Sequence, residues 1–311
     1  MTKQKRLLLA LFISMTMSML AVPVAVGQPP GADCRNLVAG RTYAHVFEGV
    51  INTELFPLPG VTGDIPNAGL GTIIFNRDGT VGGSTTLKIG PAVFVAPMVN
   101  ATYSLAWDAS KKPMMCTGTM KSDTPASPTG TENWQLVVSE MGNRVEIIHT
   151  DTGLIVGTTA FPLQRCKCSN HTLNSTYTYN AKAWSFPVPP PPPFPPFTPE
   201  ELFNGFMPFA FSGAIVFKPH VSGATGVPGA PAGSSYLEGW DMVSLNGFIT
   251  PRTYVGWYEV NADCSATMVL VDSLGNPPIH TSALILQGAD TIDILNLDVP
   301  FVLSFVANRE R

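Results

Sequence analysis

The feature that most constrains the fold of this chain is an internal repeat. CRNLVAGRTY at residues 34–43 and CSNHTLNSTY at residues 168–177 both read C-x-N-x5-T-Y without a gap. Three further pairs follow in the same order: GTIIF at 71–75 with GAIVF at 213–217, CTGTM at 116–120 with CSATM at 264–268, and NRVEII at 143–148 with DTIDIL at 290–295. Similarity that recurs in order at matched spacing indicates two copies of one folding unit.

The repeat also sets the domain organisation. The boundary between the copies lies near FPLQRCK at residues 161–167, so we expect domain 1 at residues 34–165 and domain 2 at residues 168–311. The proline-rich segment at residues 187–199 then follows the first strand of domain 2, which makes it a loop inside that domain and not the linker. Such a run favours extended polyproline II backbone. It is either a recognition arm or a surface spacer.

The residue pattern within each copy predicts an all-β fold. The chain has 28 Gly and 29 Pro, only 13% of its residues are charged, and Val, Ile, Thr and Tyr recur in short runs separated by Gly, Asn and Asp. Asp78 and Gly79 stand between two such runs and form a strong hairpin signal. With about six to eight antiparallel strands per copy and no helical crossover, we predict two tandem β-barrels, with a β-sandwich as the alternative.

The first residues have the layout of a secretory signal peptide. Lys3, Lys5 and Arg6 precede a long apolar run that ends in small residues, which predicts cleavage after residue 27. The alternative is an N-terminal membrane anchor, because the run is near the lower length limit for spanning. Residues 28–311 contain no further stretch apolar enough to span a bilayer. We therefore expect a secreted, periplasmic or cell-surface protein.

The charge of the mature chain excludes some partners. Removing the signal peptide leaves 15 Lys and Arg against 22 Asp and Glu, a formal charge of −7. Nucleic acids and anionic membranes both require a basic face, so neither is expected as a partner.

Four of the five cysteines correspond to one another in the two copies. Cys34 corresponds to Cys168, and Cys116 corresponds to Cys264. An exported protein can form disulfides, so the repeat predicts the bridges Cys34–Cys116 and Cys168–Cys264. Cys166 is then left as an unpaired thiol or as the site of a disulfide-linked dimer. A bridge from domain 1 to Cys166 is the alternative, while the C-x-C spacing does not fit a zinc site.

The motifs resemble those of a group of bacterial exported β-domain proteins described as hypothetical. Their pattern reads approximately C-S-N-x-x-L-x-G-x-Y followed by G-x-Y-x-V-N-x-D-C-T-G-T. WYEVNADCSAT at residues 257–267 is the best match, although Ala266 replaces the Gly of T-G-T. Domain 1 keeps CTGT but has SKKPMMC at residues 110–116 instead of the preceding acidic context. The strand pattern is also similar to calycin-like barrels such as allene oxide cyclase and dirigent proteins. The resemblance implies a fold and export, with no catalytic residues to carry over.

No known catalytic constellation stands out. The sequence lacks G-x-S-x-G, H-E-x-x-H, Walker and dinucleotide-binding motifs, so we predict no catalytic residue, no metal site and no cofactor. His149 has no nucleophile or orienting partner in sequence and is expected on a strand surface. Glu146 and Asp293 are repeat equivalents in different domains, so they are expected at outward strand positions. Asp241 and Asp263 are interpreted as turn or edge residues.

The aromatic residues are the remaining candidates for binding. Tyr103 with Trp134, or Trp240 with Trp257, either stack on a ligand inside a barrel or simply fill its core. We predict a non-enzymatic role: binding of a small apolar or carbohydrate ligand, or a contribution to the cell surface. The first alternative is a barrel-type cyclase or hydrolase, which an inward-facing carboxylate beside a polar lumen residue would favour. The second is an adhesion or structural protein, which a dimer linked through Cys166 would favour.

Overall fold

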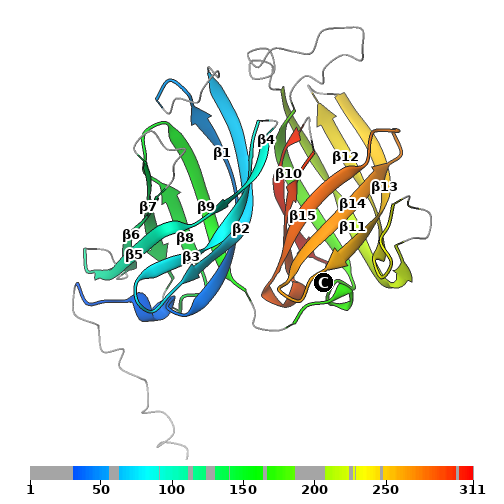
Figure 1. Ribbon diagram of the computed structural model, residues 1–311. Coiled ribbons are helices and arrows are strands. Elements are labelled where there is room, and N and C mark those ends of the chain that lie inside the picture. Colours follow the sequence, from blue (N-terminus) through cyan, green and yellow to red (C-terminus); the bar gives the residue numbers. More distant parts are fainter. Residues whose placement is uncertain are drawn as a thin grey trace, which may run out of the picture.

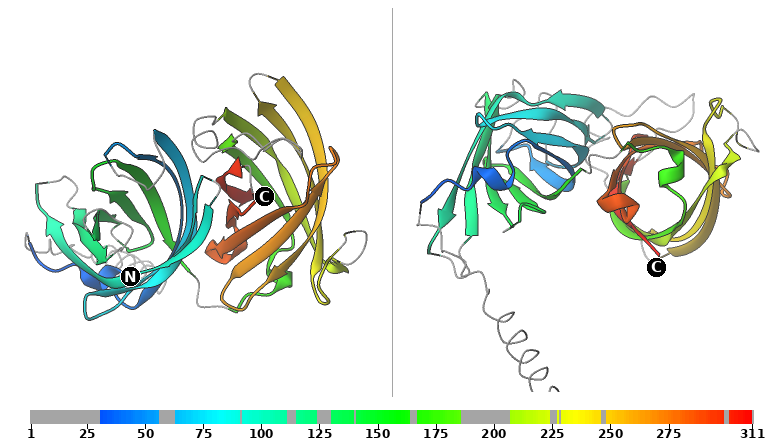
Figure 2. Two further views of the ribbon diagram at one scale, coloured as in Figure 1. Left: turned by 45° about the horizontal axis from the view of Figure 1, so that its top comes forward. Right: turned by 90° about the horizontal axis from the view of Figure 1, so that it is seen from below.

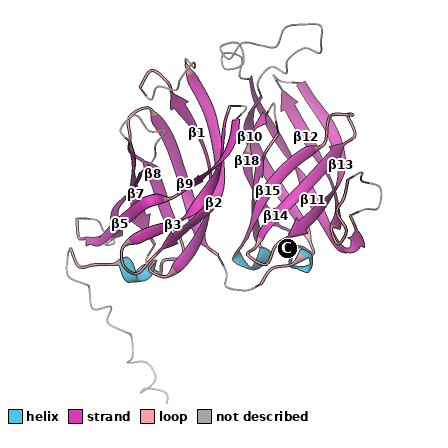
Figure 3. Ribbon diagram, in the orientation of Figure 1, coloured by secondary structure: helices cyan, strands magenta, loops and turns pink. Residues whose placement is uncertain are grey.

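The computed structural model consists almost entirely of β-strands. It describes residues 31–310 except for 56–62, 91, 111–114, 124–129, 140, 164–166, 186–206, 224–226, 228, 246–247 and 299–300. The helices of this part of the chain are three short 3-10 helices, η1 (Arg35–Leu37), η2 (Asn170–Thr172) and η3 (Gln287–Ala289) (Figure 3). None of them could cross a membrane. The predicted signal peptide, Cys166 and the proline-rich segment lie outside the described residues.

The first nine strands form one closed antiparallel barrel, called barrel 1 below. Their bounds are β1 Arg41–Asn52, β2 Asp64–Phe75, β3 Thr80–Ile89, β4 Ala92–Pro97, β5 Val99–Asp108, β6 Met115–Asp123, β7 Thr131–Val138, β8 Val145–His149 and β9 Leu154–Pro162. Strands pair in the order β2-β1-β9-β8-β7-β6-β5-β3, and pairing between β2 and β3 closes the ring, with β4 added to β3. The order follows the chain, which makes barrel 1 an up-and-down meander.

The remaining strands form barrel 2, which lies beside barrel 1 (Figures 1 and 2). Their bounds are β10 Thr176–Ser185, β11 Met207–Ser222, β12 Ser235–Leu245, β13 Phe248–Val260, β14 Ser265–Asp272, β15 Ile279–Leu286, β16 Thr291–Asn296, β17 Phe301–Val302 and β18 Ser304–Arg309. The order is β11-β12-β13-β14-β15-β16-β18-β10, and pairing between β10 and β11 closes the ring. The prediction of two all-β barrels is therefore confirmed, and the sandwich alternative was wrong because each sheet closes on itself.

The repeated motifs take the same register in the two barrels. The matched pairs are Tyr43 opposite Ile73 with Tyr177 opposite Ile215, Tyr103 opposite Met120 with Tyr258 opposite Met268, and Val145 opposite Ala160 with Ile292 opposite Ala307. All of these side chains are buried in the lumens. Since a slip of one residue would turn each side chain to the other face of the sheet, the shared register gives both barrels the same inward-facing set.

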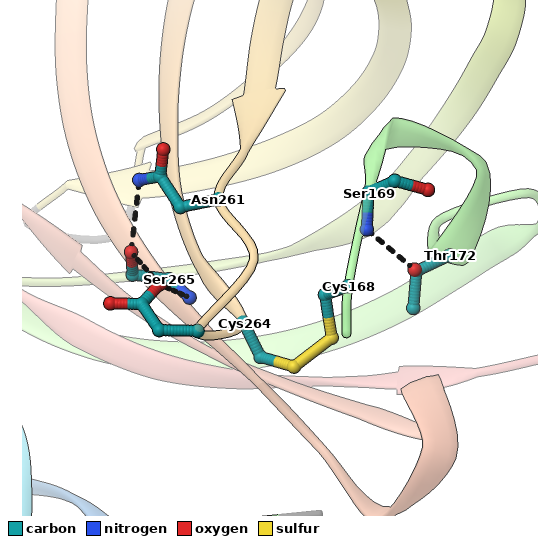
Figure 4. The surroundings of a disulfide bond; sticks show 7 residues. Cys168, Ser169, Thr172, Asn261, Cys264 and Ser265 are labelled. Atoms are coloured by element: carbon teal, nitrogen blue, oxygen red, sulfur yellow. Dashed lines mark hydrogen bonds between the residues drawn. A yellow bond between two sulfur atoms is a disulfide. The ribbon is translucent and has the colours of Figure 1, made fainter. Parts of the chain in front are cut away.

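A disulfide fastens one end of each barrel. Cys34 before η1 is bonded to Cys116 in β6, and Cys168 before η2 is bonded to Cys264 next to β14. Figure 4 shows the second bridge, with η2 beside it, where the Ser169 N–H donates to the Thr172 hydroxyl. Each bridge ties the segment before the first strand of its barrel to a strand in the middle of the sheet order.

At the same end of each barrel, a buried tyrosine hydroxyl donates a hydrogen bond to a backbone carbonyl oxygen. The Tyr43 hydroxyl donates to the carbonyl oxygen of Gly142 at 2.6 Å, and the Tyr177 hydroxyl donates to that of Ala289 at 2.5 Å. Both acceptors lie in the turn that leads into the matched strands β8 and β16. The buried hydroxyls are thereby satisfied, which burial in an apolar lumen requires.

The two barrels pack together through an apolar cluster between them. Ala44 and Leu70 of barrel 1 meet Leu284, Leu295 and Val302 of barrel 2. These residues lie on the outer faces of their strands, because their neighbours in sequence face the lumens. The interface therefore uses the outward side of β1 and β2 on one barrel and of β15, β16 and β17 on the other.

Polar groups also cross this interface. The backbone N–H of Ser304 donates to Glu48 Oε1 at 3.1 Å. Lys88 on β3 is fully buried, and its ammonium group donates to Asn296 Oδ1 at 3.4 Å and to the carbonyl oxygen of Asp298. Burial lowers the pKa of Lys88 to about 8, while the charge of Asp298 opposes that shift. Because Asn296 also lines the cavity of barrel 2, Lys88 of barrel 1 contacts a residue of that cavity.

Candidate ligand-binding cavity

A cavity of about 520 Å³ occupies one half of barrel 2. It lies at the end remote from the disulfide of this barrel, where β10 ends at Ser185 and β17 begins at Phe301. Phe248, which is 80% exposed, forms part of its lining, so the cavity reaches the molecular surface. The half of the lumen near the disulfide is instead filled by side chains such as Tyr177 and Tyr258.

Strand alternation explains how the lining arises. Along β13, Phe248, Thr250, Arg252 and Tyr254 face the cavity, whereas the intervening Ile249 is exposed on the outside. Successive side chains of a strand point to opposite faces, so a single strand supplies four lining residues at every second position.

A glycine on the neighbouring strand makes room for one of these residues. A Cβ atom at Gly239 in β12 would lie 2.4 Å from the Tyr254 hydroxyl oxygen. Because this distance is far inside van der Waals contact, only glycine permits the tyrosine to lie across β12 with its hydroxyl in the position observed.

Phenylalanine side chains form one wall of the cavity, which we call the aromatic wall: Phe209, Phe211, Phe301 and Phe305. The ring centroids of Phe209 lie 5.9 Å from Phe211 and 5.4 Å from Phe301, and those of Phe211 and Phe305 are 5.4 Å apart. These separations are typical of favourable aromatic pairs. The wall is therefore a continuous packed surface contributed by β11, β17 and β18.

A polar cluster lies at the inner end of the cavity, which we call the Asp241 cluster: Asp241, Arg252, Tyr179 and Tyr254. Arg252 Nε donates to Asp241 Oδ1 at 2.9 Å and Arg252 Nη2 donates to Oδ2 at 2.6 Å. The Tyr179 hydroxyl lies 3.0 Å from Asp241 Oδ2 and 3.0 Å from the Tyr254 hydroxyl. Tyr254 in turn donates to the Ala214 carbonyl oxygen at 2.9 Å. The two hydrogen bonds from Arg252 to Asp241 are bidentate, which is the strong form of an arginine–carboxylate pair.

A second carboxylate touches the same guanidinium. Asp272 Oδ2 is 3.5 Å from Arg252 Nη1 and accepts from Asn276 Nδ2 at 2.8 Å. Burial alone would raise the pKa of Asp272, but the hydrogen bonds from Asn276 and Leu274 and the charge of Arg252 hold it below its usual value. The cluster thus sets two carboxylates against one guanidinium.

The two tyrosines of the cluster remain protonated at neutral pH. Burial raises the pKa of Tyr179, and the neighbouring Tyr254 and Asp241 raise it further. Burial likewise raises the pKa of Tyr254. Both hydroxyls therefore act as hydrogen-bond donors, Tyr179 to Asp241 and Tyr254 to the carbonyl oxygen of Ala214.

Barrel 1 carries a different pair at the matching positions. Tyr179 pairs with Gly213 and Gly213 with Asp241, while in barrel 1 His45 pairs with Gly71 and Gly71 with Thr85. His45 Nε2 and Thr85 Oγ1 are 3.0 Å apart. Burial lowers the pKa of His45 to about 4, so the imidazole is neutral at neutral pH. The contact has the same location as Tyr179–Asp241 but carries no charge.

The aromatic pairs considered in the sequence do not line this cavity, and Tyr103 with Trp134 packs in the core of barrel 1. Trp240 and Trp257 alternate with lumen residues and face outward, with Trp240 exposed, so they do not line the cavity. Tyr103 and Trp134 border a separate groove of about 310 Å³ on barrel 1. The aromatic residues that do surround the cavity are phenylalanines and tyrosines, which sequence reasoning had not singled out.

The predicted surface position of His149 was wrong. Its side chain is only 5% exposed, and its ring packs against Trp134 with centroids 5.2 Å apart. Its Nε2 is 3.7 Å from Glu132 and its Nδ1 is 3.5 Å from Asp151. The histidine faces inward because it continues the alternation of the buried Val145 and Ile147.

Glu146 and Asp293 face outward as expected, but their surroundings differ. Glu146 is partly exposed, pairs with Arg144 and accepts from Thr159 at 2.7 Å. Asp293 is only 2% exposed, because it lies on a strand that packs against barrel 1, and its Oδ2 has no hydrogen-bond partner. Burial raises the pKa of Asp293 to about 7.

The expectation that Asp241 is a turn or edge residue was also wrong. It lies in the middle of β12 with 1% exposure, paired with Arg252 directly across the strands. The sequence carried two signals for this contact. Asp241 stands at every second position after Leu237 and Gly239, so it faces the same side of its strand as they do. Arg252 likewise shares one side of its strand with Thr250 and Tyr254. An isolated opposite-charge pair at inward positions of adjacent strands indicates a buried contact.

No protein-family model matches the chain, and the search of curated proteins found no match. Among solved structures, the chain is similar to a protein of unknown function from the DUF3598 family of Nostoc punctiforme, with 12% identity over 89% of this chain and 98% of that chain, and a TM-score of 0.21. A TM-score of this size supports no argument about this chain.

Proposed function

We propose that the protein binds a small, predominantly apolar molecule in the cavity of barrel 2. The observation that carries the proposal is the cavity itself, of about 520 Å³. Ligand sites typically measure about 300–1,000 Å³ and combine an apolar lining with a few polar groups. Eight-stranded barrels are either filled by their own side chains or hold one small ligand. The aromatic wall and the Asp241 cluster supply the two kinds of lining that this second class requires.

The character of the lining favours an apolar ligand over a carbohydrate. Phe209, Phe211, Phe301 and Phe305 present ring surface to the cavity, and burying apolar surface stabilises a complex by about 25 cal/mol per Å². A sugar would have to satisfy several hydroxyls inside the barrel, and unpaired buried hydroxyls are costly. The Asp241 cluster offers little capacity for that, because both tyrosine hydroxyls and the Nε and Nη2 atoms of Arg252 already donate to protein oxygens, and Nη1 lies against Asp272.

An enzymatic role is the second candidate. Asp241 is an inward-facing carboxylate beside the Tyr179 hydroxyl, which is the arrangement that a barrel-type cyclase or hydrolase would need. Against it, both oxygens of Asp241 already accept hydrogen bonds from Arg252, so the carboxylate is engaged in a structural pair. Turnover that is lost in Asp241→Asn while the neutral probe described below still binds would favour this candidate.

We further propose that binding takes place outside the cytoplasm. The two disulfides are compatible with an oxidising compartment. The basic residues and apolar run before residue 27 support export by cleavage of a signal peptide. Mass determination of the mature protein from its native compartment tests this, because retention of residues 1–27 would contradict it.

The binding proposal is tested with N-phenylnaphthylamine, a neutral fluorescent probe. We expect micromolar binding to the full chain with increased fluorescence. Val243→Trp places an indole in the cavity and should reduce the affinity at least about tenfold, since Val243 lines it. Val255→Trp is the matched control, because Val255 lies on the outer face of the adjacent strand. Equal binding by both variants, or no binding by the native chain, would overturn the proposal.

A further inference from the structure

We infer that the cavity selects neutral ligands and rejects anionic ones, an inference that rests on the proposed binding function. The charged residues on its lining are Asp241 and Arg252. Arg252 is held by both oxygens of Asp241 and also faces Asp272. One guanidinium thus faces two carboxylates, and the Asp241 cluster with Asp272 carries a formal charge of −1. A barrel that took carboxylates or sulfonates would need a cation free to pair with them.

The charges beside the cavity are largely buried, so the sign of a ligand's charge affects its affinity. Arg252 is 18% exposed and its carboxylate partners are 1% exposed, so the three charges interact away from bulk water. An anionic ligand would lose its hydration and meet two carboxylates within a few ångströms of the one guanidinium. Such a desolvated charge is destabilising unless a paired opposite charge offsets it. A neutral ligand avoids this cost and retains the contacts of the aromatic wall.

The remaining polar groups of the lining fit a neutral ligand with a hydroxyl or carbonyl group. Ser185, Thr250, Asn276, Thr281 and Asn296 are uncharged, and Ser185 and Asn296 end their strands at the open end of the cavity. The aromatic wall is contributed by β11, β17 and β18, whereas Thr250 and Arg252 are contributed by β13. A ligand with an apolar ring system and one polar edge would meet both kinds of lining, so we assign this chemical class to the site.

Two probes with the same ring skeleton test the inference. N-phenylnaphthylamine is neutral, and anilinonaphthalene sulfonate differs from it by one sulfonate group. We expect the full chain to bind the neutral probe at least about tenfold more tightly, equivalent to roughly 1.4 kcal/mol. Competition between the probes, and loss of both signals in Val243→Trp, would show that they share the cavity.

Charge variants make the test specific. Asp241→Asn should raise the affinity for the sulfonate relative to the neutral probe about tenfold, because it leaves one carboxylate for Arg252. Asp272→Asn should shift the ratio in the same direction and serves if the first variant does not fold. Asp64→Asn changes the net charge equally but lies at the start of β2 in barrel 1, so the ratio should not change.

The outcomes separate the two proposals. If neither probe binds in a manner that Val243→Trp abolishes, the proposed binding function fails. If both bind in the cavity and the sulfonate binds as tightly as the neutral probe, the binding function stands and the selectivity is refuted. A ratio that stays constant in both Asp241→Asn and Asp272→Asn would likewise refute the assignment to these carboxylates.

Discussion

At their disulfide-bonded ends the two barrels are built alike, and away from those ends they diverge. Tyr43 and Tyr177 donate to turn carbonyls in matching places, and both barrels fasten the same two segments with a disulfide. Farther along the lumen, His45 and Thr85 in barrel 1 stand where barrel 2 has Tyr179 and Asp241. One end of each barrel therefore secures the scaffold, while the lining of the other end differs between the two copies.

The outer faces of the barrels diverge for a different reason. Glu146 of barrel 1 and Asp293 of barrel 2 hold matching positions, opposite Thr159 and Val306 respectively. The first is solvated and paired, and the second is buried where barrel 1 packs against barrel 2. The same position in the repeat thus serves as ordinary surface in one copy and as part of the interdomain contact in the other.

The largest expected effect comes from removing the disulfides. The bridges span 82 and 96 residues, and loops of these lengths correspond to about 4–5 kcal/mol each in the chain-entropy model. We expect Cys34→Ser/Cys116→Ser and Cys168→Ser/Cys264→Ser to destabilise their barrels by nearly equal amounts in urea unfolding. A cost for one pair several times that for the other would show that the two ends are not equivalent.

Asp293→Asn should have the next largest effect, and the effect should depend on pH. The folded-state pKa of about 7 exceeds the ordinary value of 3.8, so the folded state retains the proton more strongly than the unfolded state. The free energy of unfolding is therefore highest below about pH 4 and decreases as the pH rises toward 7. At pH 8 we expect Asp293→Asn to raise the free energy of unfolding by about 4 kcal/mol, and at pH 4 by less than about 1 kcal/mol. Urea unfolding across this range measures the difference, and a gain that is the same at pH 4 and pH 8 would contradict the buried-charge explanation.

The tyrosine hydroxyls should give smaller effects. Tyr177→Phe removes the hydroxyl that donates to the buried carbonyl oxygen of Ala289, at a cost of about 1–2 kcal/mol. Tyr43→Phe should cost less, because the carbonyl oxygen of Gly142 also accepts from Arg41 Nη1 at 3.2 Å. Thermal unfolding of each variant gives the two values, and a cost for Tyr43→Phe equal to or above that for Tyr177→Phe would contradict this difference between the ends.

The predictable parts of the molecule are those that depend on local pattern and on the repeat. Strand alternation, the Asp78–Gly79 hairpin and the matched motifs predict two all-β copies of antiparallel strands, because most strands pair with their neighbours in sequence. They left the choice between a barrel and a sandwich open, since that choice depends on whether the first and last strands of each copy pair. The cavity depends on which lumen side chains from distant strands fill the same space, as when Phe209 meets Phe301, and alternation does not determine that packing. The burial of Asp293 depends on docking between barrels, for which neither copy alone contains a signal.

The smallest predicted effect belongs to Glu146→Gln, the matched control for Asp293→Asn. Arg144 is 59% exposed and Glu146 33%, so their ion pair is screened by solvent and contributes at most about 1 kcal/mol. Glutamine retains an oxygen that can accept from the Thr159 hydroxyl, which now reaches the carboxylate at 2.7 Å. We expect a change below about 0.5 kcal/mol in urea unfolding at pH 8, and little change between pH 4 and pH 8. A stabilisation comparable to that of Asp293→Asn would mean that the position itself disfavours charge in both barrels. A small or slightly destabilising change would assign the effect at Asp293 to its burial against barrel 1, which is the one respect in which the two positions differ most.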